Sequence, residues 1–240
     1  MLLKFVAIIG CRGWIPGVWI GIVLLVGCQA GVDERIGRVY SLARNPSEPN
    51  KNRIEALLND EDRDVRATAL VVMGGIDKGR AKRMAAAALE DPDGLVRAAA
   101  VGLCAERADA ETIRLLSVRA TDDPVWQVRT RALESIAQTD DPAVREAFLR
   151  ALSDSVRHVR RAALKAGIDH PGLLPVDLLS NLVVSDADWE NRVEAAIALG
   201  ASKEPAAYAG LDAAVADSNE FVRTTAARER RQLERAGVPR

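Results

Sequence analysis

Apolar residues recur three and four positions apart along most of the chain, which predicts short amphipathic helices. One such run places Val65, Ala69 and Met73 on a single helical face, and another extends over residues 143–152. Residues that favour turns separate the runs, and these include Gly74-Gly75, Asp140-Asp141-Pro142 and His170-Pro171-Gly172. The pattern therefore predicts helices that are arranged in pairs and joined by tight turns.

The helical pairs repeat every 31 or 32 residues. In all six copies an arginine has an aspartate six positions before it and an alanine three positions after it. The arginines are Arg66, Arg97, Arg129, Arg160, Arg192 and Arg223. The aspartates are Asp60, Asp91, Asp123, Asp154, Asp186 and Asp217. The alanines are Ala69, Ala100, Ala132, Ala163, Ala195 and Ala226. Six tandem units of two helices predict an all-α fold, an α-solenoid in which each unit packs on its neighbours.

The three recurrent residue types suit a structural role at the junction of the two helices. Alanine allows the closest approach of stacked helices. The aspartate falls between the two helices, where its carboxylate can accept from backbone N–H groups at the start of the second helix. The arginine can reach a carboxylate in its own turn or in the next unit. We expect these residues to form a ladder that fixes the register of the units.

The repeat unit resembles a known family. The segment Asp91-Pro92-Asp93-Gly94-Leu95-Val96-Arg97 is similar to the short bacterial HEAT repeats that phycobilisome lyases share with many scaffold proteins, and the resemblance covers about residues 50–235. It implies a HEAT-repeat scaffold that mediates protein–protein interaction, or alternatively a bilin lyase-like protein that acts on a tetrapyrrole. The amino-terminal sequence, which predicts export, argues against the alternative, because bilins are attached to cytosolic antenna proteins.

The amino-terminal 27 residues have the pattern of a secretion signal. They include Lys4 and Arg12 but no acidic residue, and an apolar run over residues 14–26 follows. The sequence Leu25-Val26-Gly27-Cys28 resembles the lipobox of bacterial lipoproteins. This resemblance implies a signal peptide over 1–27, an acylated Cys28, a tether and capping helix over 28–49 and the solenoid over 50–240. It predicts a lipid-anchored protein of the bacterial envelope, at the outer membrane and facing the periplasm. The alternative, an uncleaved membrane anchor, would have to span the bilayer with 15 uncharged residues that include Pro16.

Composition narrows the range of functions. The chain has 33 Lys and Arg against 34 Asp and Glu, so no general positive field attracts nucleic acid. Three Cys and two His in scattered positions predict neither a disulfide framework nor a metal site. The six repeat units contain no catalytic motif, so we expect that the protein is not an enzyme. We also expect that it needs no cofactor and has no small-molecule substrate.

The positions that differ between copies are the candidates for partner binding. Three positions before the ladder arginine stand Trp126 and Trp189 in the third and fifth copies. Tryptophan often anchors a protein partner, but these indoles could instead cover apolar turns. The outer face of the second helices adds Arg131, Arg161 and Lys165 as candidate contacts. We expect another protein as the partner; the alternative is a purely structural envelope spacer.

Overall fold

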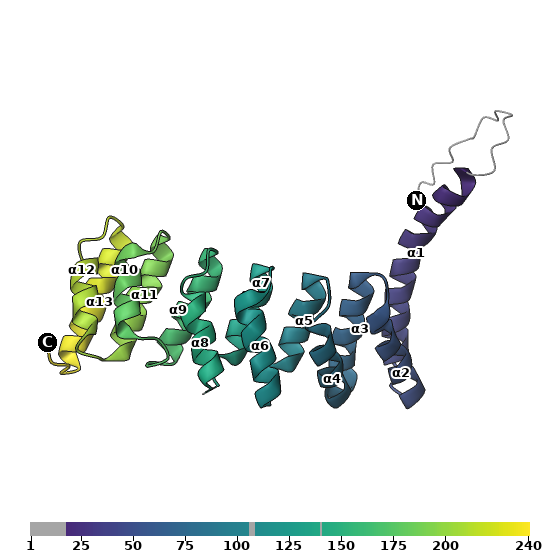
Figure 1. Cartoon of the computed structure of the whole chain (residues 1–240), viewed down its shortest axis with the longest axis horizontal. Helices are drawn as coiled ribbons and strands as arrows, with labels where there is room; N and C mark the ends of the chain where they lie inside the picture. The colour runs from purple at the N-terminus through teal and green to yellow at the C-terminus, as the bar shows by residue number, and fades with distance from the viewer. Residues whose placement is uncertain (1–17, 106–108, 140) are drawn as a thin grey trace.

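The structure is a computed structural model that describes residues 18–105, 109–139 and 141–240, with side chains from residue 31 onward. Its helices stand side by side in one extended row that runs from α1 to α13 (Figure 1). No strand occurs in these described ranges. The sequence prediction of an all-α solenoid is confirmed.

Each of the six units consists of a first helix and a second helix. The first helices are α2 (Glu48–Ala56), α4 (Lys78–Ala88), α6 (Ala110–Asp122), α8 (Pro142–Ala151), α10 (Val176–Ser185) and α12 (Ala207–Ala214). The second helices are α3 (Arg63–Ile76), α5 (Gly94–Cys104), α7 (Trp126–Ile136), α9 (Arg157–Asp169), α11 (Trp189–Ser202) and α13 (Glu220–Arg235). A short 3-10 helix, η1 (Leu57–Asn59), extends α2. Consecutive second helices pack on one another throughout the row.

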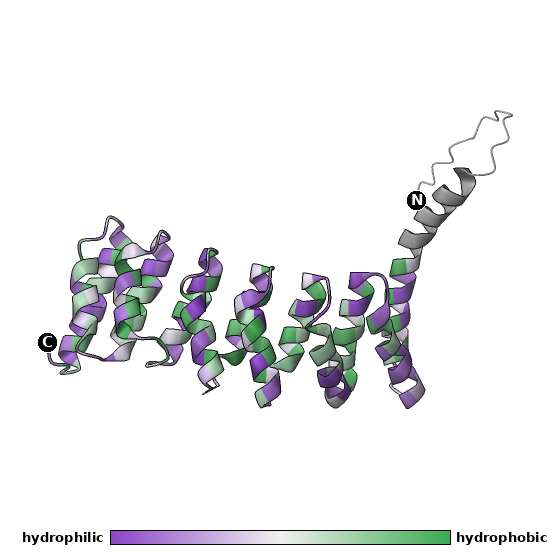
Figure 2. Ribbon diagram, in the orientation of Figure 1, coloured by the Kyte–Doolittle hydropathy of each residue, from purple (hydrophilic) through white to green (hydrophobic). Residues whose placement is uncertain are grey.

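The core follows the columns of the repeat. The six alanines three residues after the ladder arginines are all fully buried, as are the residues just before those arginines. Hydrophobic and hydrophilic residues alternate along the helices, as expected where only one side of each helix is buried (Figure 2). Burial also makes the Cys104 thiol inert, because it raises its pKa to about 11.

Asn191 occupies a buried position that is valine in the other five units. Its side-chain amide donates to the carbonyl of Arg157 at 3.2 Å and to a carboxylate oxygen of Asp186 at 3.3 Å. Its side-chain oxygen accepts from Nε of Arg161 at 3.2 Å. The polar exception is therefore satisfied by three hydrogen bonds, of which the two to Arg157 and Arg161 join the fourth and fifth units.

Helix α1 (Val18–Ala43) precedes the first unit and packs on α2 and α3. It takes the place that the second helix of a preceding unit would have, with Val39 fully buried. The capping helix expected within residues 28–49 thus ends at Ala43, and residues 48 and 49 instead begin α2. The physical reason is that Pro49 suits the first turn of a helix, where its missing N–H costs nothing.

The predicted signal peptide and lipidation site fall largely outside this description. Residues 1–17 lie outside the described residues, and the side chain of Cys28 lies in the undescribed part of α1. Among the helices that are described, none combines the length and the apolar character needed to cross a bilayer.

Candidate interaction surface

The ladder arginines bind carboxylates of the following unit. Arg66 donates from Nε and Nη2 to the two carboxylate oxygens of Asp91, at 2.7 and 2.8 Å. Its Nη1 donates to the backbone carbonyl of Asp60 at 2.9 Å. Four further rungs repeat both contacts: Arg97–Asp123, Arg129–Asp154, Arg160–Asp186 and Arg192–Asp217. Of the two arrangements open from the sequence, the carboxylate of the next unit is the one used.

The ladder aspartates are also held within their own turns. Each accepts a hydrogen bond from the backbone N–H two residues later, as Asp91 does from Asp93 at 2.8 Å. They do not cap the second helices, contrary to the expectation from the sequence. Where a side chain caps such a helix, it belongs to a residue two positions further on: Asp62, Asp93, Asp188 or Asn219. The carboxylate therefore fixes the turn that leads into the helix, and the arginine joins that turn to the preceding unit.

The ladder has one more member than the sequence analysis found. Arg35 of α1 lies with its Nε 3.1 Å from a carboxylate oxygen of Asp60. It precedes Arg66 by the repeat interval of 31 residues, and this spacing is the feature of the sequence that could have identified it. The aspartate and alanine of the repeat pattern are missing around Arg35, because Gln29 stands where the aspartate would be and Arg38 where the alanine would be.

Hydrogen bonds within the ladder lower the pKa of several of its carboxyl groups. The bond from Arg192 is the main cause for Asp217. For Asp91 and Asp186, burial acts in the opposite direction, but the bonds from the arginine and the backbone N–H outweigh it, so the pKa falls below its ordinary value. These carboxyl groups bind protons less readily in the folded chain than in the unfolded chain.

Acid is therefore expected to destabilise the solenoid. A carboxyl group with a lowered pKa stabilises the fold above its unfolded pKa, here about 3.8, and loses that contribution as the pH falls through the lowered value. The free energy of unfolding, measured with urea between pH 7 and pH 2, should fall steeply below about pH 4. Asp217→Asn should make this dependence shallower, because it removes one of the titrating groups. A free energy that stays constant down to pH 2 would contradict this role of the ladder.

The two candidate tryptophans each stack on an aromatic ring of the next unit. Trp126 lies 4.7 Å from the ring of His158, and Trp189 lies 5.4 Å from the ring of Phe221, measured between ring centroids. In both pairs the partner ring stands two positions before the ladder arginine of the next unit. Trp126 is half-buried, whereas Trp189 and Phe221 are 39% and 64% exposed. The indoles thus bridge neighbouring units, and the second pair also presents apolar surface to solvent.

Phe221 was missed by the sequence analysis. Its position two residues before Arg223 corresponds to Leu95 in the second unit, which is also exposed, at 49%. Phe221 directly precedes Val222, a member of the buried valine column, and neighbouring residues of a helix point in different directions. This position next to the column could have indicated that the Phe221 ring faces outward. We call the beginnings of the second helices that carry these side chains the aromatic ridge; its members are Leu95, Trp126, His158, Trp189 and Phe221.

The charged candidates do not form one cluster with the tryptophans. Arg161 is engaged within the protein, since its guanidinium contacts Asp188 at 3.1 Å as well as Glu190 and Asn191. The guanidinium of Arg131 lies against Gly102 of the preceding unit. Lys165 is exposed on α9. Arg161 therefore serves the contact between the fourth and fifth units, and the other two remain candidates for partner contact.

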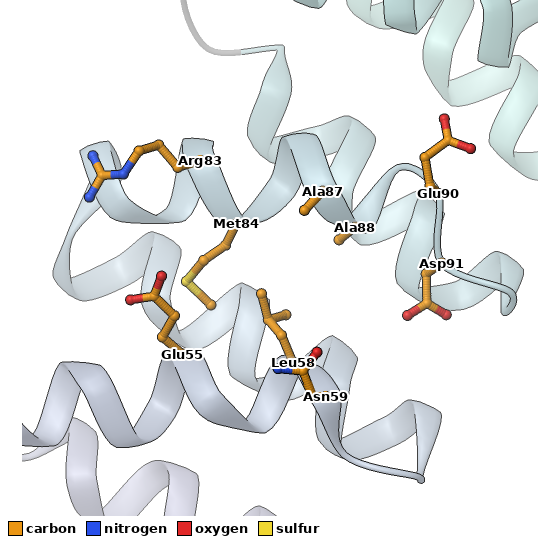
Figure 3. Close-up of a pocket in the computed structure, with 9 residues that line it drawn as sticks. All are labelled: Glu55, Leu58, Asn59, Arg83, Met84, Ala87, Ala88, Glu90 and Asp91. Atoms are coloured by element: carbon orange, nitrogen blue, oxygen red, sulfur yellow. The ribbon is translucent and has the colours of Figure 1, made fainter.

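A depression of about 540 Å³ lies between α2 and α4, on the side of the first helices (Figure 3). Met84 and Leu58 point toward each other at its centre, while Arg83 and Glu90 point away from them. The carboxylate of Asp91 at its rim is already held by Arg66. The depression therefore lacks converging acid, base or nucleophilic groups. In the part of the chain that is described, no three His, Cys, Asp or Glu side chains gather as metal ligands would.

Comparison with known proteins places this architecture among repeat solenoids. The family model of HEAT repeats matches residues 50–137. No curated protein matches the sequence. Among solved structures, the YibA protein of E. coli is 21% identical with a TM-score of 0.57, over 83% of this chain and 77% of that one.

Two further structures have the same fold. The archaeal HEAT-like repeats protein from Thermococcus onnurineus NA1 is 13% identical, with a TM-score of 0.55 over 84% of this chain and 92% of that one. A designed armadillo repeat protein in complex with the peptide (KR)4 is 18% identical, with a TM-score of 0.56 over 78% of this chain and all of that one. The chain is thus a solenoid of the HEAT and armadillo type, with HEAT repeats matched over residues 50–137.

Proposed function

We propose that this protein is a non-enzymatic scaffold that binds another protein along the aromatic ridge, while a lipid on Cys28 holds it at a bacterial membrane. The observation that carries the binding role is the stacked pair of Trp189 and Phe221, because Trp189 is 39% exposed and Phe221 is 64% exposed. Exposed aromatic side chains on a rigid support are typical anchors of protein interfaces, because they bury much apolar area at little cost in conformational entropy.

The extended shape supports this role. A row of stacked units offers one continuous surface, which suits an elongated partner. The designed armadillo protein with the same kind of fold holds a peptide, (KR)4. The near balance of charges on the present chain favours a partner of mixed polarity over a polyanion.

Replacing the tryptophans tests the ridge. Trp189→Ala should weaken partner capture by more than about 1 kcal/mol with little change in melting temperature, because its indole is partly exposed. Trp126→Ala should lower the melting temperature more, since that indole is half-buried against His158. The partner is first identified by crosslinking in membranes from positions 126 and 189, and its affinity is then measured for the purified variants.

Val71→Ala is the matched control, because Val71 is an exposed apolar residue of a second helix that lies outside the ridge. It should leave the affinity unchanged. If Trp189→Ala lowers the melting temperature but binds normally at temperatures where it is folded, the ridge is only a packing feature. That outcome would leave the structural spacer as the better description.

Membrane attachment is supported by the sequence Leu25-Val26-Gly27-Cys28 behind a basic and apolar leader. Two or three acyl chains at one terminus are sufficient for stable anchoring. Gln29 follows the cysteine, and by resemblance to enterobacterial sorting an aspartate there would retain the protein at the inner membrane. The proposed location is therefore the periplasmic side of the outer membrane.

Mass spectrometry of the amino-terminal peptide tests the anchor. We expect a mature chain that begins at acylated Cys28 and fractionates with outer membranes. Cys28→Ala should release the protein from membranes or stall its processing, and its solenoid should keep the same helical content. An unmodified peptide that still contains residues 1–27 would show that the lipobox interpretation is wrong.

A further inference from the structure

The ladder is open at its carboxyl-terminal end. Arg223 is held in the same way as the other ladder arginines, with its Nη1 donating to the carbonyl of Asp217 at 2.8 Å and to that of Ser218 at 2.9 Å. Helix α13 is the last helix of the described residues, and among these residues no carboxylate lies within ion-pair distance of Arg223. Its Nε and Nη2 edge therefore has no acidic partner within the described chain.

Five rungs of the same protein show what this edge binds. In each, Nε and Nη2 hold the two oxygens of one aspartate at 2.7–3.0 Å. The aspartate comes from the turn between two helices and is fixed by a backbone N–H two residues later. Because Arg223 is oriented by the same backbone contact, it is already arranged for a bidentate carboxylate.

The surroundings of Arg223 favour an acidic partner. Residues 220–240 contain six arginines but three glutamates. Arg228 is paired with Glu229 at 2.7 Å, and Arg230 is paired with Asp212 at 3.1 Å. Arg231 and Arg235 are exposed on α13, without a carboxylate at ion-pair distance in the described structure. The end of the solenoid is thus positively charged, in a chain whose net charge is -1.

A second copy of this chain does not supply the missing group. The aspartate of its first unit, Asp60, already forms an ion pair with Arg35 at 3.1 Å, and α1 covers that end of the row (Figure 1). The first end of the ladder is therefore closed by the chain itself, whereas the last end is not.

We propose that the end face formed by α13 binds an acidic segment of another protein, with an aspartate of that segment held by Nε and Nη2 of Arg223. This site is separate from the depression between α2 and α4. It requires neither a lipid anchor nor a partner bound along the whole aromatic ridge. Phe221, two residues before Arg223, adds an exposed apolar ring to the same end of the solenoid.

A peptide taken from the protein's own ladder is a suitable probe. An acetylated and amidated peptide with the sequence of residues 86–95 contains Asp91, the residue that Arg66 binds. The peptide is titrated into the full-length protein, and the Nε–H signal of Arg223 is followed by NMR. We expect the chemical shift of this signal to change with peptide concentration until it saturates. A peptide with Asp91→Asn should bind with an affinity at least tenfold lower.

Variants of α13 show whether binding depends on a bidentate contact between Arg223 and the aspartate of the peptide or on general electrostatic attraction. Affinities of the variants are measured by isothermal titration calorimetry with the same peptide. Arg223→Gln and Arg223→Lys should each weaken binding at least tenfold, because glutamine lacks the charge and lysine keeps it but cannot form the bidentate contact. Arg231→Gln is the matched control, as it removes one charge from the same helix, and it should weaken binding less than threefold. Melting temperatures should change little in all three variants, since none breaks an internal ion pair and the Arg223 variants alter only hydrogen bonds to backbone carbonyls.

Three results would overturn the proposal: a wild-type protein whose Arg223 signal does not respond, equal losses for Arg223→Gln and Arg231→Gln, or equal binding of the Asp and Asn peptides. The first result would mean that the Nε and Nη2 edge of Arg223 is bound by water and not by a carboxylate of the peptide. The others would show attraction by net charge alone.

Discussion

Replacement of Arg97 by alanine is expected to lower the free energy of unfolding by about 3–5 kcal/mol. The rung that Arg97 forms with Asp123 is the most buried of the ladder, with side-chain exposures of 6% and 0%. The variant leaves the Asp123 carboxylate buried, and among the described residues the other cation within ion-pair distance is Arg119, at 4.0 Å. Losing one member of a buried pair costs much more than the pair contributes net, because the remaining charge stays desolvated. Urea unfolding followed by circular dichroism measures the difference.

Other rungs provide a graded comparison. Arg129→Ala and Arg160→Ala remove arginines from more accessible pairs, with arginine exposures of 10% and 14%, and should cost about 1–3 kcal/mol each. Arg223→Ala should cost least, because within the described residues Arg223 binds backbone carbonyls and no carboxylate. Equal losses at all four positions, or no loss at the central ones, would show that stacking does not depend on the ladder.

The repeat architecture could be predicted from the sequence because its signal is periodic. An aspartate, an arginine and an alanine in fixed positions of six copies specify a turn and a buried helix contact whatever surrounds them. The direction of the arginines could not be predicted. Whether Arg66 reaches its own turn or that of the next unit depends on how consecutive second helices are offset, and this offset results from packing along the whole row.

The ends of the ladder were harder to predict for the same reason. Arg35 satisfies the interval but not the neighbouring columns, since the unit to which it would belong has no first helix and needs neither the aspartate nor the alanine. Arg161 was predicted as a candidate surface contact, yet it binds Asp188, Glu190 and Asn191 of the next unit. Variation between copies therefore indicates two different things, a partner surface or a contact specific to one pair of units. Only the structure separates them.

The same distinction applies to the tryptophans. They stand at the same position of the third and fifth units, and both stack on a ring of the following unit. Their surroundings differ in exposure: Trp126 meets a half-buried histidine, whereas Trp189 meets a phenylalanine that is itself 64% exposed. The sequence could thus locate the ridge, but the part of it that is open to a partner became clear from Phe221.

Close packing between the last two first helices leads to a further prediction. Gly210 of α12 faces α10, and a Cβ atom at this position would lie 2.9 Å from the backbone Cα of Ser180 and 2.9 Å from a methyl carbon of Leu199. Backbone cannot move aside as a flexible side chain can, so the two helices would have to separate. Gly210→Ala is therefore expected to destabilise the protein by about 1–3 kcal/mol, although alanine is the better helix former.

Gly75→Ala is the matched control for this prediction. Gly75 lies near the end of α3, and a Cβ atom there would meet nothing within 4 Å. Without a steric cost, the lower entropy of the unfolded chain should make this variant more stable, by about 0.4–1 kcal/mol. Thermal and urea unfolding of the two variants should thus shift in opposite directions. If Gly210→Ala were also stabilising, α12 could not be packed against α10 as closely as the structure shows, and the fit of the last unit to the fifth would have to rest on the Arg192–Asp217 rung instead.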